Sequence, residues 1–112
     1  MKVIKADSLC AESVSHAQGI TKYVMVKNGE IPHLTNFSTA ILHTGDSVPP
    51  HVHPDMCEVF YLQAGAAEFT VRGSRFPLKV GDCLVVEPGE EHSIENPYME
   101  DLSLVYFGLV VQ

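Results

Sequence analysis

The stretch GDSVPPHVHPDMCEVFYLQAG, residues 45–65, decides the fold and contains three candidate metal ligands, His51, His53 and Glu58. Two histidines separated by one residue share a face of an extended strand, because strand side chains alternate with a period of two. A turn at Pro54-Asp55 brings the carboxylate of Glu58 back to face the two imidazoles. Two neutral imidazoles and a carboxylate bind divalent first-row metals and leave coordination positions for substrate. The stretch therefore predicts a metal site in a small β-fold.

A second segment supplies a fourth candidate ligand, His92. It follows a tight turn at Pro88-Gly89, which ends the apolar run Val85-Val86. Three histidines and one glutamate favour Fe, Mn, Ni, Cu, Co or Zn over Mg or Ca, which prefer oxygen ligands. The set also argues against a closed structural zinc site, which more often recruits cysteines. We therefore expect one divalent transition metal as the cofactor.

Short apolar segments separated by turn residues make up most of the chain, and one of the expected turns is Pro49-Pro50. Residues 67–72 and 76–80 alternate apolar and polar side chains, as half-buried antiparallel strands do. Residues 102–111 are apolar on both faces, which predicts either a central strand or one covered by another subunit. No long segment combines helical periodicity with helix caps. The pattern predicts a single all-β sandwich or barrel.

The N-terminal part of the chain has weaker signals. Residues 1–19 are expected to form a loosely structured arm, because their apolar residues follow no sustained period. The first strands of the domain are expected at residues 23–26 and 37–43, where β-forming residues are concentrated. The chain contains three cysteines, with no CxxC pair, and we expect them to be reduced. Cys57 precedes Glu58 and therefore points to the opposite face of an extended segment, as a small apolar side chain and not as a ligand.

Composition restricts the class of protein. A chain of 112 residues with 46% hydrophobic and 19% charged residues is long enough for one folded domain. Its formal net charge of -7 argues against binding nucleic acid, which requires a basic patch. Residues 1–15 lack the apolar stretch of a signal peptide, and no window approaches the ~18 apolar residues of a membrane span. We expect a cytoplasmic protein that binds neither nucleic acid nor membranes.

The two segments resemble the pair of motifs that define the cupin superfamily. The first motif has glycine, a His-x-His pair, glutamate and glycine, which are matched by Gly45, His51, His53, Glu58 and Gly65. The second is matched by Gly81, Gly89, His92 and Asn96. The chain departs from the family pattern at Glu87, where the family has proline, and Pro88 follows instead. The spacing from Gly89 to His92 is kept, so the expected ligand is retained.

This resemblance implies a small, single-domain metal-binding cupin. Its fold would be a jelly-roll barrel or sandwich of six to eight or more short antiparallel strands over residues 20–112, with the motifs at residues 45–65 and 81–96. Four side chains would converge on the metal: His51, His53, Glu58 and His92. The resemblance also implies a homodimer, since similar small cupins share strands or pack sheets together.

An open metal site beside an apolar wall predicts chemistry on a small molecule. Phe60 and Leu62 share the face of Glu58 by alternation, so they are expected to form this wall. Four protein ligands leave about two positions on an octahedral metal for a small oxygen-rich or carbonyl-containing molecule. We expect a metal-dependent enzyme of the dioxygenase or isomerase/lyase type, with Glu58 as a possible general base. The alternative is a non-enzymatic binder or sensor of a small ligand, and the motifs do not distinguish the substrate, the reaction or the metal.

Overall fold

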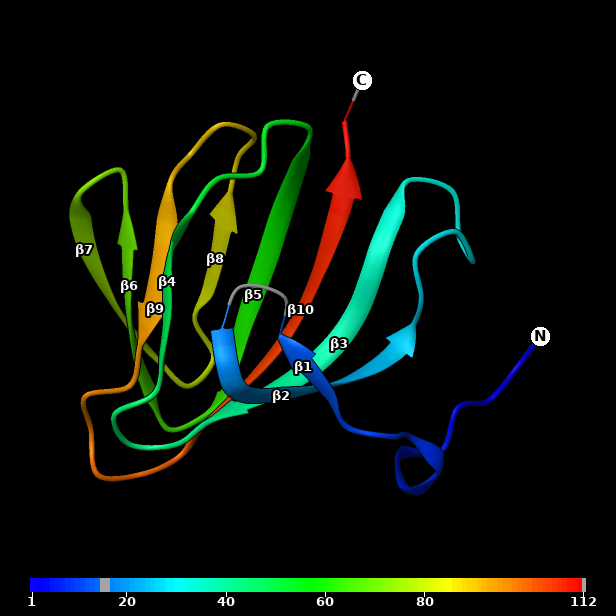
Figure 1. Ribbon diagram of the computed structural model, residues 1–112, viewed down its shortest axis with the longest axis horizontal. Coiled ribbons are helices and arrows are strands. Elements are labelled where there is room, and N and C mark those ends of the chain that lie inside the picture. Colours follow the sequence, from blue (N-terminus) through cyan, green and yellow to red (C-terminus); the bar gives the residue numbers. More distant parts are fainter. Residues whose placement is uncertain (15–16, 112) are drawn as a thin grey trace.

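The computed structural model describes residues 1–14 and 17–111 and shows two antiparallel sheets that face each other (Figure 1). In the larger sheet the strand order is β1 (Glu12–Val14), β2 (Ala17–Val26), β3 (Leu34–Leu42), β10 (Leu102–Val110), β5 (Met56–Ala64) and β8 (Cys83–Val86). In the smaller sheet it is β4 (Ser47–His51), β9 (His92–Glu95), β6 (Ala66–Val71) and β7 (Ser74–Lys79). A 3-10 turn, Ala6–Ser8, precedes β1. The predicted all-β jelly-roll architecture is confirmed.

The core lies between the two sheets, and strand alternation builds it. In β6, Ala67 and Phe69 are fully buried, while Glu68 and Thr70, which alternate with them, are only half-buried. Phe69 contacts the ring of Phe60 from the facing sheet at a centroid distance of 5.2 Å. Burying one such large apolar side chain stabilises a fold by about 1.5–3 kcal/mol. The apolar side of each strand thus determines how the sheets stack.

Strand β10 is a central strand of the six-stranded sheet, paired with β3 on one side and β5 on the other. Its inward residues Leu102 and Leu104 are buried, and its outward residues Val105 and Phe107 remain half-buried. Of the two alternatives for residues 102–111, the central strand is confirmed for residues 102–110.

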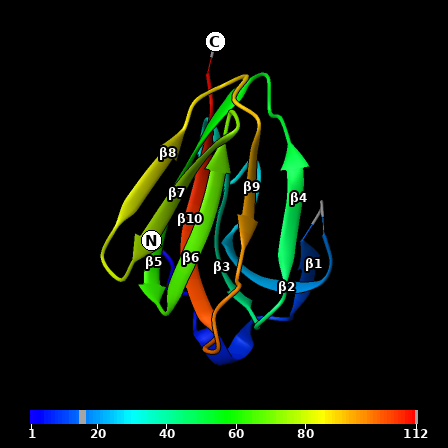
Figure 2. The same ribbon diagram turned by 90° about the vertical axis from the view of Figure 1, so that its left-hand side faces the viewer.

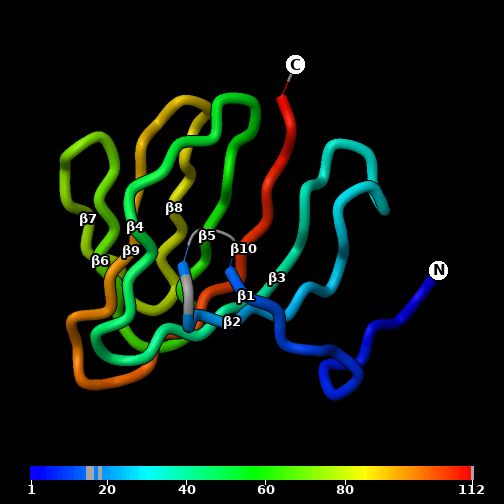
Figure 3. Tube along the Cα trace, viewed as in Figure 1, coloured from blue at the N-terminus to red at the C-terminus, as the bar shows by residue number. Residues whose placement is uncertain are grey.

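The structure corrects the expected N-terminal boundary of strand structure. Residues 12–14 and 17–19 were expected in a loose arm. Instead, residues 12–14 form β1, and residues 17–19 are the first residues of β2. Strand β2 is therefore much longer than the predicted 23–26, and β3 begins at Leu34 instead of Phe37. The polar residues here carry no period-two signal, because the pairing of β1 with β2, and not local propensity, holds them in the sheet. The trace in Figure 3 shows only the first residues lying apart from both sheets. Residues 15–16, also part of the predicted arm, lie outside the described residues.

The predicted turn at Pro49-Pro50 is wrong, because both prolines lie inside β4. Strand β4 is an edge strand, seen on the right of Figure 2 in front of the larger sheet. Its register with β9 is irregular between Val48 and His51, so the prolines occupy the place where the ladder is interrupted. Edge strands and ladder irregularities are the positions in a sheet that accept proline.

The motif glycine Gly65 allows the tight connection from β5 to β6. Its φ is 78°, a left-handed conformation that favours glycine. A Cβ atom at this position would also collide with the backbone carbonyl of Asp101. Both constraints explain why the first motif must end in glycine.

No helix among the described residues is long and apolar enough to cross a membrane.

Candidate metal centre

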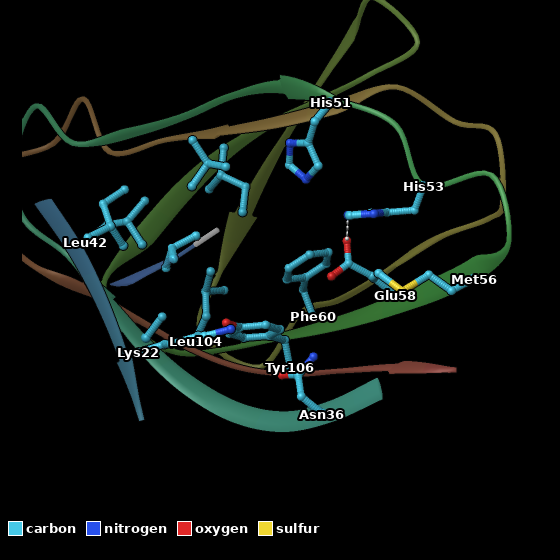
Figure 4. Close-up of a pocket in the computed structure, with 15 residues that line it drawn as sticks. Lys22, Asn36, Leu42, His51, His53, Met56, Glu58, Phe60, Leu104 and Tyr106 are labelled. Atoms are coloured by element: carbon cyan, nitrogen blue, oxygen red, sulfur yellow. Dashed lines mark ion pairs between the residues drawn. The ribbon is translucent and has the colours of Figure 1, made fainter. Parts of the chain in front are cut away.

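The four predicted ligands converge at one end of the space between the sheets. His51 ends β4, His53 lies in the β4–β5 connection, Glu58 lies in β5, and His92 begins β9. One donor atom from each side chain lies within 4.8 Å of the others. Figure 4 shows His51, His53 and Glu58 pointing toward the same space. The cluster joins the two sheets, because Glu58 comes from the larger sheet, whereas His51 and His92 come from the smaller one.

The two motif histidines meet by a different route from the one the alternation predicts. Strand β4 ends at His51, so His53 does not share a strand face with it. The chain bends at Pro54-Asp55 as expected, and the imidazole rings of His51 and His53 lie 5.0 Å apart. His51 is also the cross-strand partner of His92, with ring centroids 4.2 Å apart. Cross-strand pairing thus explains the fourth member of the cluster.

Backbone carbonyls orient two of the imidazoles. The Nδ1 atom of His92 lies 2.9 Å from the carbonyl oxygen of Glu90, and that of His51 lies 2.8 Å from the carbonyl oxygen of Pro49. A carbonyl only accepts a hydrogen bond, so each neutral ring carries its proton on Nδ1 and presents Nε2 as the metal-binding nitrogen. Metal-ligating histidines are typically oriented in this way.

Glu58 is a buried carboxylate, 7% exposed, and it needs positive charge nearby. Its Oε1 atom lies 3.0 Å from Nε2 of His92 and 3.3 Å from Nε2 of His53. Burial lowers the pKa of His92, but the hydrogen bond and charge of Glu58, together with Glu90, raise it, and the pKa is raised on balance. Three nitrogen donors around one carboxylate fit a divalent transition metal, whose charge would compensate Glu58 directly.

A cavity of about 110 Å³ extends from this cluster into the core. Phe60 lines it as expected, whereas Leu62 is buried elsewhere and is not among the lining residues. The ring of Tyr106 stacks on Phe60 at a centroid distance of 5.7 Å. Burial, with the charge of Glu58, raises the pKa of Tyr106 to about 12, so its hydroxyl stays protonated at neutral pH. The cavity is small compared with drug-sized pockets of about 300–1,000 Å³, and it suits a ligand of few atoms.

Three polar lining residues, Lys22, Asn36 and Tyr106, were not expected from the sequence as part of the site. Lys22 and Asn36 lie outside both motifs and outside the strands predicted at residues 23–26 and 37–43. Tyr106 lies within residues 102–111, which were expected as an apolar strand without a role in the site. One sequence signal could have placed Lys22 in the cavity. Alternation puts Lys22 on the same strand face as the apolar residues Ile20 and Val24, and the structure shows both of these buried.

The fold and this His/Glu cluster define a class of small two-sheet β-proteins with a ligand cavity between the sheets. A protein-family model described as "Cupin domain" matches residues 38–111, which is most of the chain. The chain therefore belongs to the cupin family.

A curated protein and a crystal structure, both from Thermotoga maritima, resemble the chain over nearly its whole length. The oxalate-binding protein is 29% identical over 113 aligned positions, covering 92% of this chain and 89% of that protein. The crystal structure of a predicted oxalate decarboxylase has a TM-score of 0.89 at 25% identity, covering 98% of this chain and 100% of the other. KdgF from Halomonas sp. shares the fold, with a TM-score of 0.80 at 19% identity over 97% of this chain and 94% of that one.

Proposed function

We propose that this cupin binds one divalent transition metal and uses it to bind and transform a small carboxylate or carbonyl compound. The proposed ligands are His51, His53, Glu58 and His92. The observation that carries the proposal is the convergence of their donor atoms within 4.8 Å of one another, at one end of the cavity. The donor set accepts Fe, Mn, Ni, Cu, Co or Zn.

The residues around the centre define what the site can do. A bound metal would supply Lewis-acid polarisation of a ligand oxygen, or redox chemistry if the ion is redox-active. Glu58 is the group that would accept a proton from the ligand, since its carboxylate faces the cavity. Phe60 excludes water from one wall, and the protonated hydroxyl of Tyr106 remains a hydrogen-bonding group. This arrangement supports proton transfer and carbon–carbon or carbon–oxygen chemistry on a small acid.

Oxalate and related short acids are the ligand class that we propose. The support is the similarity to a protein described as oxalate-binding and to a structure described as a predicted oxalate decarboxylase. The cavity volume of about 110 Å³ suits molecules of this size. The description of the first relative as a binding protein also favours a second candidate function, reversible ligand binding without turnover.

The test begins with elemental analysis of the purified protein, followed by calorimetric titration of oxalate into the metal-loaded form. We expect about one metal per chain, oxalate binding only in the loaded form, and loss of both in His51→Ala. The matched control is His43→Ala, since His43 is an exposed histidine outside the cavity. Assays for formate, carbon dioxide and oxygen uptake then separate the enzyme from the binder. Metal-loaded protein that binds no member of a carboxylate and carbonyl panel would contradict the proposal.

We also propose that two copies pair through the outer face of the six-stranded sheet. Cross-strand register places these outer side chains in two rows, Tyr23-Thr39-Val105-Tyr61-Cys83 and Phe37-Phe107-Val59-Val85. Neither row contains a charged residue, although the chain has a formal net charge of -7. A second copy can approach closely only where no negative charges meet, and a two-fold contact requires a patch that fits itself. An uncharged apolar face meets the first condition, and it carries no charge that a two-fold axis would place against its own copy.

A further inference from the structure

Lys22 is the one lysine or arginine among the described residues that line the cavity. It lies on β2 between Ile20 and Val24, which are 2% and 8% exposed, so its side chain belongs to the inner face of the sheet. Figure 4 shows it entering the cavity from the side opposite to His53. The cavity therefore has a cationic group at one end and the proposed metal centre at the other.

The ammonium group of Lys22 has no ion pair among the described residues of the chain. Its cross-strand neighbour on β1 is Glu12, an exposed carboxylate whose charge reaches Tyr106 in the cavity but which forms no ion pair with Lys22. A half-buried ammonium beside an apolar wall is costly without a compensating anion. A ligand carboxylate entering the cavity would supply that anion.

Asn36 extends the polar patch from Lys22 toward the centre. Its Oδ1 atom accepts a hydrogen bond from Ser38 Oγ at 2.5 Å, which fixes the orientation of the amide. Its Nδ2 atom donates one hydrogen to Thr35 Oγ1 at 3.3 Å, leaving the second N–H to donate to an anion. Asn36 pairs with Gly108, which in turn pairs with Glu58, so only a glycine separates them along this row of the sheet. The Thr35 hydroxyl and the Met56 sulfur lie where a Cβ atom of Gly108 would be, and Asn36 itself lines the cavity.

The strand order sets the span that a ligand must bridge. Lys22 on β2 and Glu58 on β5 are separated by β3 and β10. The row of Lys22 runs through Ala40 and Leu104 to Leu62, which is four residues from Glu58 along β5. Three strand spacings of about 4.8 Å and four residue rises of about 3.3 Å place the two backbones roughly 20 Å apart on a flat sheet, and the two side chains on the inner face shorten this gap. Oxalate, with adjacent carboxylates, is too short to reach both groups. A dicarboxylate with carbon atoms between its acid groups is the chemistry that fits.

We propose that Lys22, assisted by Asn36, binds the distal carboxylate of a short dicarboxylate such as succinate, whose other end lies at the His/Glu centre. This inference rests on the proposed function and names its substrate class. Lys22 acts as a specificity-determining residue: it contacts the ligand away from the reacting end and discriminates by charge and length. Oxalate would bind at the centre alone, without Lys22.

The test compares ligand affinities in Mn²⁺-loaded protein by calorimetry, using succinate, oxalate and the neutral analogue succinamide. Lys22→Met removes the charge and keeps most of the side-chain volume. We expect succinate affinity to fall about tenfold or more, as for loss of a charged hydrogen bond, with Mn²⁺ stoichiometry and oxalate affinity unchanged. Lys22→Arg should restore part of the succinate affinity, and wild-type protein should prefer succinate to succinamide. Lys79→Met is the matched control, because Lys79 is exposed on β7.

Each outcome of this comparison decides between the two proposals. Unchanged succinate affinity in Lys22→Met would overturn the role of Lys22 alone, as would wild-type protein that binds oxalate but not succinate. Equal losses for oxalate and succinate would indicate a general structural effect and would also overturn it. Mn²⁺-loaded wild-type protein that binds none of the acids would overturn the proposed function itself.

Discussion

The two sheets share one core but have opposite outer faces. The four-stranded sheet, which faces the viewer in Figure 2, carries Glu68, Thr70, Arg75 and Glu95 outward, and Arg75 forms an ion pair with Glu68 at 3.1 Å. The six-stranded sheet exposes two uncharged rows instead, in which Tyr61 and Val85 are 45% and 56% exposed. An antiparallel sheet with one solvated face normally alternates apolar and polar residues. Only the smaller sheet follows this rule, which is why we propose that a second copy covers the outer face of the larger sheet.

The inner faces differ as well. The smaller sheet contributes His51 and His92 to the centre, whereas the larger sheet contributes Glu58 and the polar cavity residues Lys22 and Tyr106. The proposed centre therefore lies where the two sheets meet. A change in how the sheets pack should also change ligand binding. Substitutions on the inner faces should affect stability and binding, and those on the outer faces should affect only assembly.

Inner packing should give the largest effect. Phe69 and Phe76 are cross-strand partners on β6 and β7, but Phe69 is fully buried and Phe76 is 45% exposed at the sheet edge. Phe69→Ala should lower the free energy of unfolding by about 3–5 kcal/mol, because it leaves a cavity between the sheets. Phe76→Ala, the matched control, should cost less than about 1 kcal/mol. Denaturant titration measures both, and equal losses would contradict the assignment of the core to the inner faces.

Glu58 should give the next largest effect, through the metal. A free metal concentration of 100 times the dissociation constant raises the free energy of unfolding by about 2.7 kcal/mol. Wild-type protein should therefore gain thermal stability on adding Mn²⁺, and Glu58→Gln should gain none. Glu95→Gln, on the exposed face of β9, should behave as wild type. Differential scanning calorimetry measures these gains. A full Mn²⁺-dependent gain in the thermal stability of Glu58→Gln would show that the Glu58 carboxylate is not one of the metal ligands.

The outer faces should differ in assembly. Wild-type protein should run at twice the chain mass of 12.3 kDa in light scattering coupled to size exclusion. Tyr61→Glu places one negative charge per copy in the uncharged rows and should yield the monomer. Thr70→Glu adds the same charge to the outer face of the smaller sheet and should leave the dimer intact. Monomeric wild-type protein would contradict pairing through this face.

The sequence predicted the parts of the site that depend on local spacing. His51, His53 and Glu58 are separated by one bend, so their proximity is encoded within one short segment. His92 joins them through the pairing of β4 with β9, and it was predicted from the resemblance of its own segment to the second cupin motif. Lys22 joins the same cavity only because β2 pairs with β3, and β3 with β10, which comes more than half the chain later. No local pattern specifies such pairings. The place of Lys22 in the cavity wall could therefore be found only from the structure.

The errors in secondary structure have the same origin. Proline usually ends a strand, so Pro49-Pro50 was predicted as a turn. Both prolines fit within β4 because β4 is an edge strand. Residues 12–14 are too few and too polar to show a strand period, and their pairing with β2 holds them in place. By contrast, β6 and β10 were predicted because alternation and continuous apolarity reflect burial directly.

The smallest effect should come from His43, which lies between β3 of one sheet and β4 of the other. A hydrogen bond from its Nδ1 to Asp101, 2.9 Å away, raises the pKa of His43 above its ordinary value of 6.5, and Asp46 adds to the shift. Because the folded state holds this proton more tightly, the contact stabilises the fold below the unfolded-state pKa and is lost as pH rises through the folded-state pKa. An NMR titration should show the raised pKa, and Asp101→Asn should return it toward 6.5. Since the pair is exposed and outside the cavity, metal and oxalate binding should not change in this variant; a change in either would link the loops between the sheets to the centre.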